Sequence, residues 1–453
     1  MTHPSPRLHR HVLLSTLFLF ALLPARVRAA TPEPVRAGVQ EVVDRELSGL
    51  LDDYRHIHSH PEISFQEKNT AAYLAAALRK VGFDVATEVG GHGIVGVLRN
   101  GDGPTVLVRT DMDALPVKEL TGLPFASEAT TRDDQGNEVP VMHACGHDIN
   151  MTCWLGAART LTRLKQHWSG TLVMIGQPAE ERGAGANAML NDGLFKRFPL
   201  PDYCVALHVN ADTPAGTVGY VPGFAMANVD SVDITLRGVG GHGAFPHSTK
   251  DPIVLAAQTV LALQTIVSRE INPTEPAVIT VGSIHGGTKH NIIPDEVRLQ
   301  LTLRSYTDEV REQTIAAIRR LARGLAVAAG IPEDRLPVVT VKDEFTPAAY
   351  NDPELTERLA GVFKTWLGEG NVYRRQPVMG GEDFGRYGRT EHKIPICMFS
   401  LGGVSSESVK ASLASGKGLP SLHSAVFAPD SEPAIRTGVT AMSAAVLDLL
   451  GQK

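Results

Sequence analysis

The sequence of 453 residues contains no low-complexity tract, no coiled-coil run and no internal repeat. With 43% hydrophobic and 20% charged residues, it has enough apolar side chains to build a core. A disordered chain is therefore excluded outside the N-terminal residues. The length is too great for one ordinary domain and fits two.

Cysteine is scarce, with four residues in the chain. Their wide spacing is unlike that of a small scaffold held by disulfides. Cys153, Cys204 and Cys397 lie in or beside apolar stretches, where we expect small buried thiols. Cys145 differs because it stands two residues before a histidine.

The apolar run near the N-terminus, residues 12–23, is shorter than the roughly 20 residues that span a bilayer. Arg7 and Arg10 precede it and Ala29 follows, which is the pattern of a cleaved export signal over residues 1–29; an uncleaved anchor is the alternative. No paired arginines precede the run, which favours Sec-type export. We therefore expect a periplasmic or secreted protein.

Positive charge is also in short supply. Loss of residues 1–29 removes four arginines and no acidic residue, which moves the formal net charge from −6 to −10. A protein with this negative net charge is not expected to bind nucleic acid or an anionic membrane. We expect neither as a partner, and no stable membrane association after signal cleavage.

Two catalytic signatures are absent. No Gly-x-Ser-x-Gly motif occurs, which argues against a serine hydrolase of that type. Gly286-Gly287 is not followed by Lys and Ser or Thr at the spacing of a phosphate-binding loop, so we interpret it as a turn.

Apolar, β-branched runs alternate with segments of helical periodicity, which predicts an α/β fold with a doubly wound, mostly parallel sheet. The predicted strands of this large catalytic domain are residues 105–109, 171–175, 204–209 and 394–401, and its clearest helices are 151–164 and 434–450.

An inserted segment has a different order of elements. Residues 225–341 are predicted as strand, helix, two strands, helix and strand, which is the ferredoxin-like α+β pattern. We therefore expect a catalytic domain formed by residues 35–224 and 342–453, interrupted by a lid or dimerisation domain at 225–341. The six predicted elements are 230–236, 252–269, 277–284, 297–304, 307–329 and 338–342.

Candidate metal ligands follow the predicted strands of the larger domain, where ligands of open α/β sheets bind. Cys145 and His147 offer a thiol and an imidazole two residues apart, both good ligands for Zn²⁺ or a similar ion. Each cluster alone is weak, but their convergence predicts a divalent metal site. The clusters are Asp111 with Asp113, residues 143–148 in a turn before a helix, Glu180 with Glu181, and His208.

The adjacent carboxylates Glu180 and Glu181 could have two different roles in one reaction. One can bind a metal ion, while the other acts as general base toward a water that the metal makes more acidic. The same base can later return the proton to a leaving amine.

These residues resemble the M20 metallopeptidase superfamily, and more closely its amidohydrolase branch of hippurate hydrolases, aminoacylase-like enzymes and auxin-conjugate hydrolases. The motifs cover nearly the whole chain after the signal. In order they are Arg55-His56 with His60-Pro61-Glu62, Asp111-Met112-Asp113-Ala114-Leu115-Pro116, residues 143–148, Glu180-Glu181, Gly240-Gly241-His242-Gly243-Ala244, His290-Asn291-Ile292-Ile293-Pro294, Gly381-Glu382-Asp383-Phe384 and Leu422-His423-Ser424.

The resemblance implies a metal-dependent amidohydrolase that cleaves N-acyl amino acids with two divalent ions, Zn²⁺ or Mn²⁺. Glu180 would be the general base, and Asp113 would orient a ligand imidazole. His242 would stabilise the oxyanion, often from the lid of a partner subunit in a homodimer, while Asn291 and Arg304 would contact the substrate carboxylate. The implied metal ligands are Cys145, His147, Glu181, His208 and His423.

One position departs from the branch, which usually has a histidine where this chain has Asn150. The change leaves all the implied ligands and the base in place. Other histidines receive no metal role here: His56, His58 and His60 fit a short turn or edge segment, and His143 fits a structural neighbour of the site.

Two alternatives use the same fold. A carboxypeptidase or dipeptidase would share the chemistry and differ only in its pocket, although the Cys145 form of the motif favours the amidohydrolase branch. A non-catalytic periplasmic binding protein would have lost the base or a ligand, and none of these positions is lost.

Overall fold

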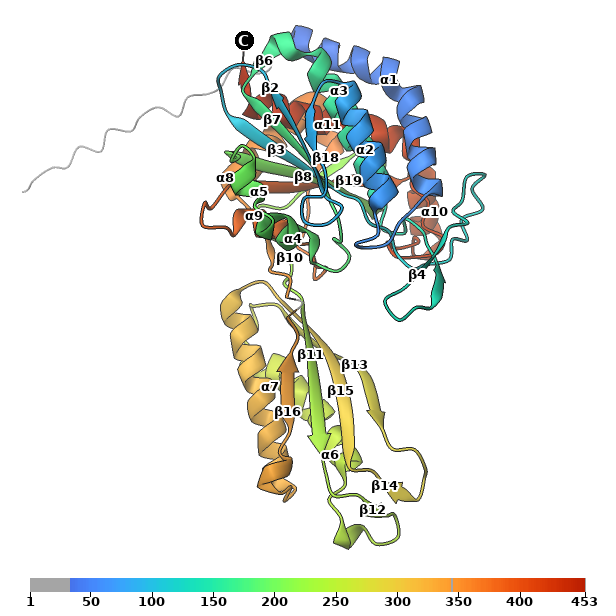
Figure 1. Ribbon diagram of the computed structural model, residues 1–453, viewed down its shortest axis with the longest axis vertical. Coiled ribbons are helices and arrows are strands. Elements are labelled where there is room, and N and C mark those ends of the chain that lie inside the picture. The colour runs from blue at the N-terminus through green and yellow to red at the C-terminus, as the bar shows by residue number, and fades with distance from the viewer. Residues whose placement is uncertain (1–32, 344, 453) are drawn as a thin grey trace, which may run out of the picture.

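A computed structural model describes residues 33–343 and 345–452, so the predicted export signal lies outside the described residues. Figure 1 shows a broad upper body and a narrower lower body joined by a thin neck. The neck contains β10 (Gly223–Met226) and β17 (Ala349–Asn351), which pair with each other where the chain leaves and re-enters the upper body.

The upper body is built on an eight-stranded sheet in the order β1-β2-β7-β3-β8-β19-β9-β18. Its four central strands are parallel, and the pairings of β1 with β2, β2 with β7 and β19 with β9 are antiparallel. The central strands are β7 (Thr171–Gln177), β3 (Thr105–Asp111), β8 (Tyr203–Pro214) and β19 (Ile396–Val404), and the outer ones are β1 (Asp84–Ala86), β2 (Ile94–Arg99), β9 (Val218–Tyr220) and β18 (Val372–Arg374).

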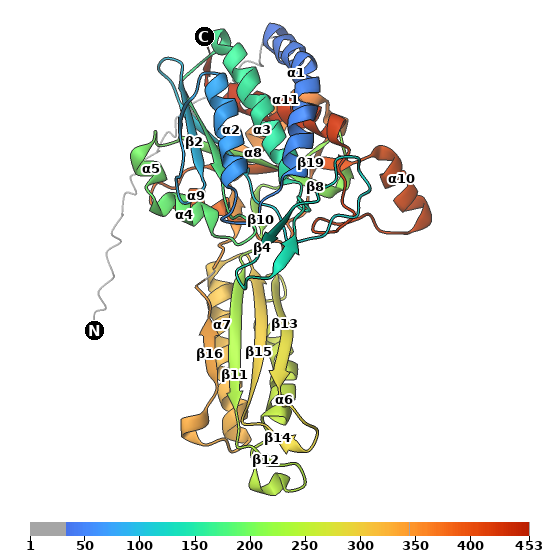
Figure 2. The ribbon, with the colours of Figure 1, turned by 45° about the vertical axis from the view of Figure 1, so that its right-hand side comes forward.

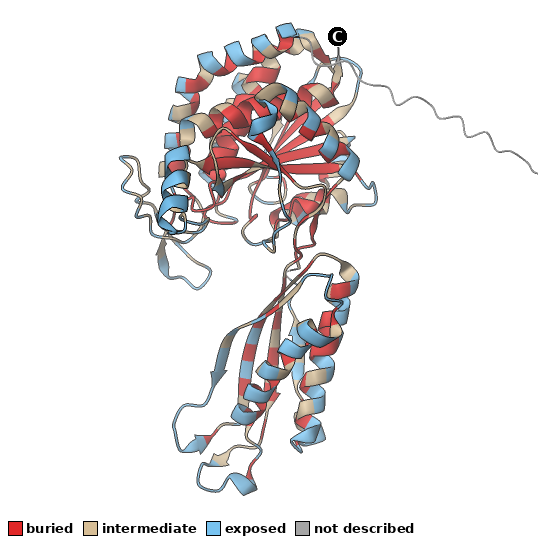
Figure 3. Ribbon diagram, turned by 180° about the vertical axis from the view of Figure 1, so that it is seen from behind, coloured by how far each residue is buried: buried red, intermediate tan, exposed pale blue. Residues whose placement is uncertain are grey.

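Helices cover both faces of this sheet, as its continuously apolar strands require. Figure 3 shows the buried sheet between helices whose outer sides are exposed. One core lies beneath α1 (Glu33–Ser59), α2 (Lys68–Lys80), α3 (His147–Arg163), α8 (Pro353–Leu367) and α11 (Ser431–Leu449). A second core lies beneath α4 (Gly185–Asn191), α5 (Leu194–Arg197) and α9 (Gly385–Gly388) on the other face.

The lower body is a separate α+β unit with its own core. Its antiparallel sheet has the order β13-β15-β11-β16. Figure 2 shows that β12 and β14 form a short ribbon at the end farthest from the neck. The elements are β11 (Asp230–Arg237), β12 (Gly241–His242), α6 (Pro252–Thr265), β13 (Ala277–Gly286), β14 (Ile292–Ile293), β15 (Glu296–Ser305), α7 (Asp308–Ala328) and β16 (Val338–Val341).

The helical stretch Pro252–Glu270 is long and apolar enough, by composition alone, to cross a membrane. One side of it packs on the lower sheet through Leu255, Ala256 and Leu263. The other side exposes Ile253, Val254 and Leu261, the last of which is 73% exposed.

The α/β fold predicted from the alternation of elements is confirmed. Two local predictions are wrong. The predicted turn before residue 151 is already helical, because α3 begins at His147 after Gly146 takes a left-handed conformation with a φ of 75°. His56 and His58 do not lie in a turn or edge segment, because α1 continues to Ser59. The four cysteines are buried and unpaired with one another.

Candidate active site

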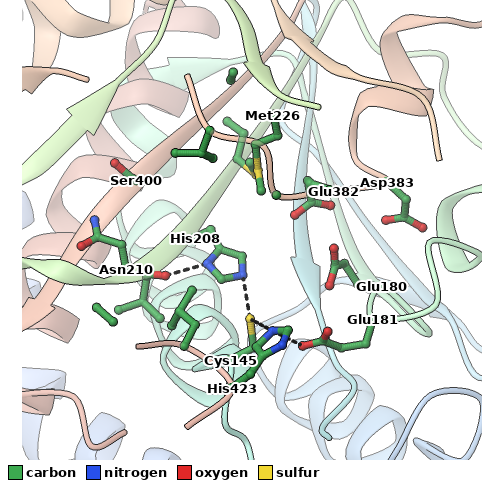
Figure 4. Close-up of a pocket in the computed structure, with 18 of the residues that line it drawn as sticks. Cys145, Glu180, Glu181, His208, Asn210, Met226, Glu382, Asp383, Ser400 and His423 are labelled. Atoms are coloured by element: carbon green, nitrogen blue, oxygen red, sulfur yellow. Dashed lines mark hydrogen bonds and ion pairs between the residues drawn. The ribbon is translucent and has the colours of Figure 1, made fainter. Parts of the chain in front are cut away.

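The upper body gathers the predicted metal ligands at the carboxyl ends of its parallel strands. Glu181 follows β7, His208 lies within β8, and Cys145 and His147 stand at the start of α3. His423 comes from the loop between α10 (Ser406–Ser415) and α11. Figure 4 shows Cys145, Glu181, His208 and His423 pointing toward one another.

Unusual backbone conformations present these side chains. Gly146 cannot be replaced easily, because a Cβ there would lie 2.3 Å from Cγ1 of Val209. Its left-handed turn lets Cys145 and His147 approach the same point. Ala179 and His423 also have positive φ values, 49° and 66°, which are uncommon for non-glycine residues and often occur at functional sites.

The ligand atoms are close together. His423 Nε2 lies 3.3 Å from Cys145 Sγ and 3.4 Å from Glu181 Oε1. Cys145 Sγ lies 3.7 Å from His208 Nε2. His147 Nε2 lies 4.0 Å from Glu181 Oε1. Bonds of about 2.0–2.3 Å in tetrahedral geometry place neighbouring ligands roughly 3.3–3.8 Å apart, so the first three of these separations fit metal ligation and the fourth, at 4.0 Å, is slightly longer.

Two buried polar atoms that have no partner in the described part of the chain also indicate that these residues could hold divalent ions. His147 Nε2 and Glu181 Oε1 are buried without a hydrogen-bond partner among the described residues, and a metal ion would satisfy both. Two groups of converging ligand atoms are Cys145 with His147 and His208, and Cys145 with Glu181 and His423. Cys145 belongs to both, which places its thiol between the two groups.

The electrostatic field favours the metal-binding form of Cys145. Burial opposes ionisation of the thiol, but the nearby imidazoles of His208 and His147 together outweigh it and lower the pKa of Cys145 to about 7. The Cys145 thiol and the Glu181 carboxylate, 3.3 and 3.4 Å from Nε2 of His423, in turn raise the pKa of His423 to about 10. A thiolate beside cationic imidazoles is a site that exchanges protons for metal ions.

Asp113 holds the loop that carries the two glutamates. Its carboxylate accepts hydrogen bonds from the backbone N–H groups of Glu180 and Glu181 and from the hydroxyl of Ser64. Its backbone carbonyl, at 2.7 Å, accepts the hydrogen bond from Nδ1 of His147, whereas the carboxylate oxygen is 3.6 Å from that nitrogen. Asp113 therefore orients the imidazole through its main chain and the glutamates through its side chain.

Glu180 is buried, with an oxygen 3.8 Å from Nε2 of His147. Figure 4 shows its carboxylate between Glu181 and Glu382. Burial, followed by the nearby carboxylates of Glu382 and Glu181, raises the pKa of Glu180 well above its ordinary value. A carboxylate with a raised pKa beside a metal cluster suits proton transfer at neutral pH.

The sequence did not reveal the buried cluster of charged residues beside Glu180, which is centred on Arg109. Arg109, fully buried, has ion pairs of 2.7 Å with Asp111, 2.8 Å with Glu382 and 3.3 Å with Asp383. Gln177 also donates to Asp383 at 2.6 Å. Asp111 and the Gly381-Glu382-Asp383 motif stood out along the chain, but nothing indicated Arg109, which lies 273 residues from Glu382.

His58 has a role that the sequence did not suggest. It is buried, and its two ring nitrogens lie 2.6 Å from Asp148 and 3.0 Å from Glu119. Asp148 follows the predicted ligand His147, so this ion pair ties α1 to the start of α3. His143 is buried nearby, where burial lowers its pKa to about 4 and keeps it neutral.

Of the three predicted site residues in the lower body, Arg304, His242 and Asn291, only Arg304 lines the cavity of the candidate site in this chain. Arg304 of β15 lines the cavity of about 1300 Å³ that contains Cys145, Glu180 and His423. His242 and Asn291 lie on and beside the β12–β14 ribbon at the far end of the lower body (Figure 2), and neither lines this cavity.

Comparisons with known proteins place this site in a family. The family described as Peptidase family M20/M25/M40 matches residues 107–414. A hippurate hydrolase of Campylobacter jejuni is 37% identical over 351 residues, covering 77% of this chain and 86% of the relative. Thermostable carboxypeptidase 1 of Saccharolobus solfataricus is 37% identical over 374 residues, covering 82% and 88%.

A solved structure shares the architecture. The YXEP protein of Bacillus subtilis, described as a dinuclear metal binding peptidase from the M20 family, superposes with a TM-score of 0.71 and 27% identity. The match covers 90% of this chain and all of that one.

Proposed function

This chain belongs to peptidase family M20/M25/M40 and hydrolyses amide bonds, and we propose that its substrates are N-acyl amino acids. The observation that carries this proposal is Arg304, a half-buried guanidinium facing the same cavity as Glu180 with no ion pair among the described residues. Burial lowers its pKa, and a substrate carboxylate would compensate its charge.

The five converging ligands are proposed to hold two divalent ions, as the dinuclear description of the Bacillus subtilis relative supports. Zn²⁺ suits the thiolate and imidazoles, and Mn²⁺ is the alternative. Such ions would polarise the scissile carbonyl and make the attacking water more acidic.

The chain's own residues complete the reaction. Glu180 takes a proton from the attacking water as the C–O bond forms, and gives it to the amide nitrogen as the C–N bond breaks. The products are a carboxylic acid and a free amino acid. Arg304 holds the carboxylate of the amino acid part, which fixes the scissile bond beside Glu180.

We further propose that a homodimer completes the site with His242 as oxyanion donor and Asn291 as a carboxylate contact. Both lie too far from the metal ligands to act within one chain. The lower body has features of an interface: α6 exposes Val254 and Leu261, and β13 is an edge strand of its sheet. A second copy packed there would offer its lower body to this chain's site.

Export to the periplasm or medium is also proposed, on the pattern of residues 1–29. Fractionation of cells that express the full chain tests it. We expect a shortened product outside the cytoplasm. Leu17→Arg with Leu19→Arg should retain the full-length chain inside, and equal export of this variant would overturn the proposal.

Activity is tested on protein starting at Ala30, with N-acetyl and N-benzoyl amino acids and dipeptides as substrates. Reactions contain added Zn²⁺, added Mn²⁺ or a chelator. We expect chelator-sensitive release of amino acid from the N-acyl substrates. Glu180→Gln should lower kcat by about 10²–10⁴-fold while metal content stays unchanged. Glu41→Gln, at an exposed position of α1, is the matched control.

Other outcomes would replace the proposal. Faster hydrolysis of dipeptides would make the chain a dipeptidase or carboxypeptidase with the same site. Failure to hydrolyse any substrate, with metal bound, would make it a binding protein.

A further inference from the structure

The cavity has a polar corner that the metal cluster does not use, formed by Asn210 and Ser400. Asn210 lies two residues beyond the ligand His208 on β8, and therefore on the same face of the strand. Ser400 of β19 is the parallel partner of His208. Figure 4 shows both residues beside His208, on the side away from Glu382.

The orientation of the Asn210 amide is fixed by its oxygen. Oδ1 accepts hydrogen bonds from the backbone N–H groups of Asp212 and Thr213, at 3.2 and 3.0 Å, and from the Thr213 hydroxyl at 2.7 Å. A flipped amide would lose both hydrogen bonds from the backbone N–H groups, because an amide nitrogen cannot accept them. Nδ2 must therefore be the free end, and it is buried without a partner among residues 33–343 and 345–452.

Ser400 is in the same situation. Its hydroxyl is buried and has no partner in the part of the chain that the structure describes. Gly219 lies opposite, and a Cβ there would come within 2.4 Å of the Ser400 Oγ. Two buried polar groups without partners are costly, so their presence side by side in a cavity points to a ligand that completes their hydrogen bonds.

Arg375 determines the charge of this corner. Its two terminal nitrogens bind the carboxylate of Asp212 at 2.8 and 2.6 Å, which compensates its charge. Its aliphatic part packs on Gly219 and so covers Ser400. Because Asp212 is 62% exposed, the ion pair is weak and Arg375 can move aside for a ligand. The corner is neutral overall and favours a neutral hydrogen-bonding group over a carboxylate.

We propose that Asn210 and Ser400 form a subsite for a neutral oxygen in the acyl part of the substrate, such as the hydroxyl of a hydroxyacyl group. The inference rests on the proposed function, in which Arg304 holds the amino acid carboxylate. Arg304 Nη1 approaches Gly381, next to Glu382, on the other side of His208 from this corner. The acyl chain then extends from the scissile carbonyl toward β8 and β19.

The test compares pairs of N-acyl amino acids that differ by a hydroxyl in place of a methyl group, at the second, third or fourth carbon of the acyl chain. The measurement is kcat/KM for the wild type, Asn210→Asp and Ser400→Ala. Asn210→Asp keeps the three hydrogen bonds of Oδ1, turns the free donor into an acceptor and adds a negative charge to the corner. Ser443→Ala removes another buried hydroxyl without a partner among the described residues, on α11 away from the cavity, and is the control.

We expect the wild type to prefer the hydroxyl over the methyl analogue by at least about fivefold for one chain length. That preference should fall to about unity in Asn210→Asp and Ser400→Ala and persist in Ser443→Ala. Equal hydrolysis of each pair by the wild type, or an unchanged preference in both subsite variants, would overturn the subsite while leaving the proposed amidohydrolase intact. If the enzyme instead preferred a hydroxyl only in the side chain of the amino acid part, the assignment of the subsite to the acyl group would be wrong. Failure to hydrolyse any N-acyl amino acid would instead reject the proposed function.

Discussion

Asn150 donates a hydrogen bond from Nδ2 to Oδ1 of Asp111 over 2.9 Å, at the end of β3 beneath the metal ligands. Its own oxygen accepts the backbone N–H of Val209, also at 2.9 Å. Asn150 therefore joins α3 to two strands, and Val209 directly follows His208, a proposed metal ligand. The asparagine at the position where this chain departs from the branch it resembles therefore links these elements.

Replacement of Asn150 by alanine should loosen the metal cluster. The variant leaves Oδ1 of Asp111 and the N–H of Val209 buried without these partners, at a cost of about 1–3 kcal/mol in the free energy of unfolding. Loss of such a support typically lowers metal affinity by about 10–100-fold. Urea unfolding and metal content after dialysis check both effects. Asn150→His, which keeps a nitrogen donor, should retain more metal; an alanine variant equal to the wild type would disprove the bridging role.

The buried Arg109 should be among the most sensitive positions in the upper body. Arg109→Met leaves the carboxylates of Asp111, Glu382 and Asp383 without their compensating charge, which should cost about 3–5 kcal/mol of unfolding free energy. Denaturant unfolding measures it. Arg320→Met removes an exposed ion pair with Glu270 and should cost less than about 1 kcal/mol. Similar costs for the two variants would contradict the assigned roles.

His58 should make the protein less stable in alkaline solution. Burial opposes its protonation, but hydrogen bonds to Asp148 and Glu119 raise its pKa to about 10, from an ordinary value of about 6.5. The stability that charged His58 supplies is therefore complete below about pH 6.5 and lost as the pH rises toward 10.

His58→Gln, measured by urea unfolding across this range, separates this effect from other titrations. The free-energy difference between wild type and variant should be largest near pH 6 and shrink steadily toward pH 10. A difference that does not change with pH would show that His58 is not charged in the folded protein.

Mixing two inactive variants should restore activity if His242 acts across a dimer interface. His242→Ala lacks the oxyanion donor and Glu180→Ala lacks the base, but a mixed dimer contains one complete site. Random exchange of subunits then restores roughly a quarter of wild-type activity. Leu261→Glu, on the exposed side of α6, should prevent the restoration by blocking association. Measured activity no higher than that of either variant alone would reject the shared site.

Local sequence patterns were sufficient for much of the fold and for part of the candidate site. The apolar runs of β3 and β7 begin at the predicted residues and each continues two residues further, to Asp111 and Gln177. Ligands at the ends of parallel strands are close in space whatever the loops do, because those ends share one edge of the sheet. Hence the order of strands and motifs along the chain is enough to predict that Cys145, Glu181 and His208 lie together.

The sequence by itself determined which elements form and which side chains stand at their ends, because both follow from periodicity and neighbouring residues. Only the tertiary structure decided which distant side chains pair. It placed Arg109 against Glu382, His58 against Asp148, and Asn210 beside Ser400. It also separated His242 from the site by the length of the lower body. These relationships depend on how the packed layers bring remote segments together. The pattern of apolar and charged residues along the sequence does not indicate which distant residue each of these side chains will contact.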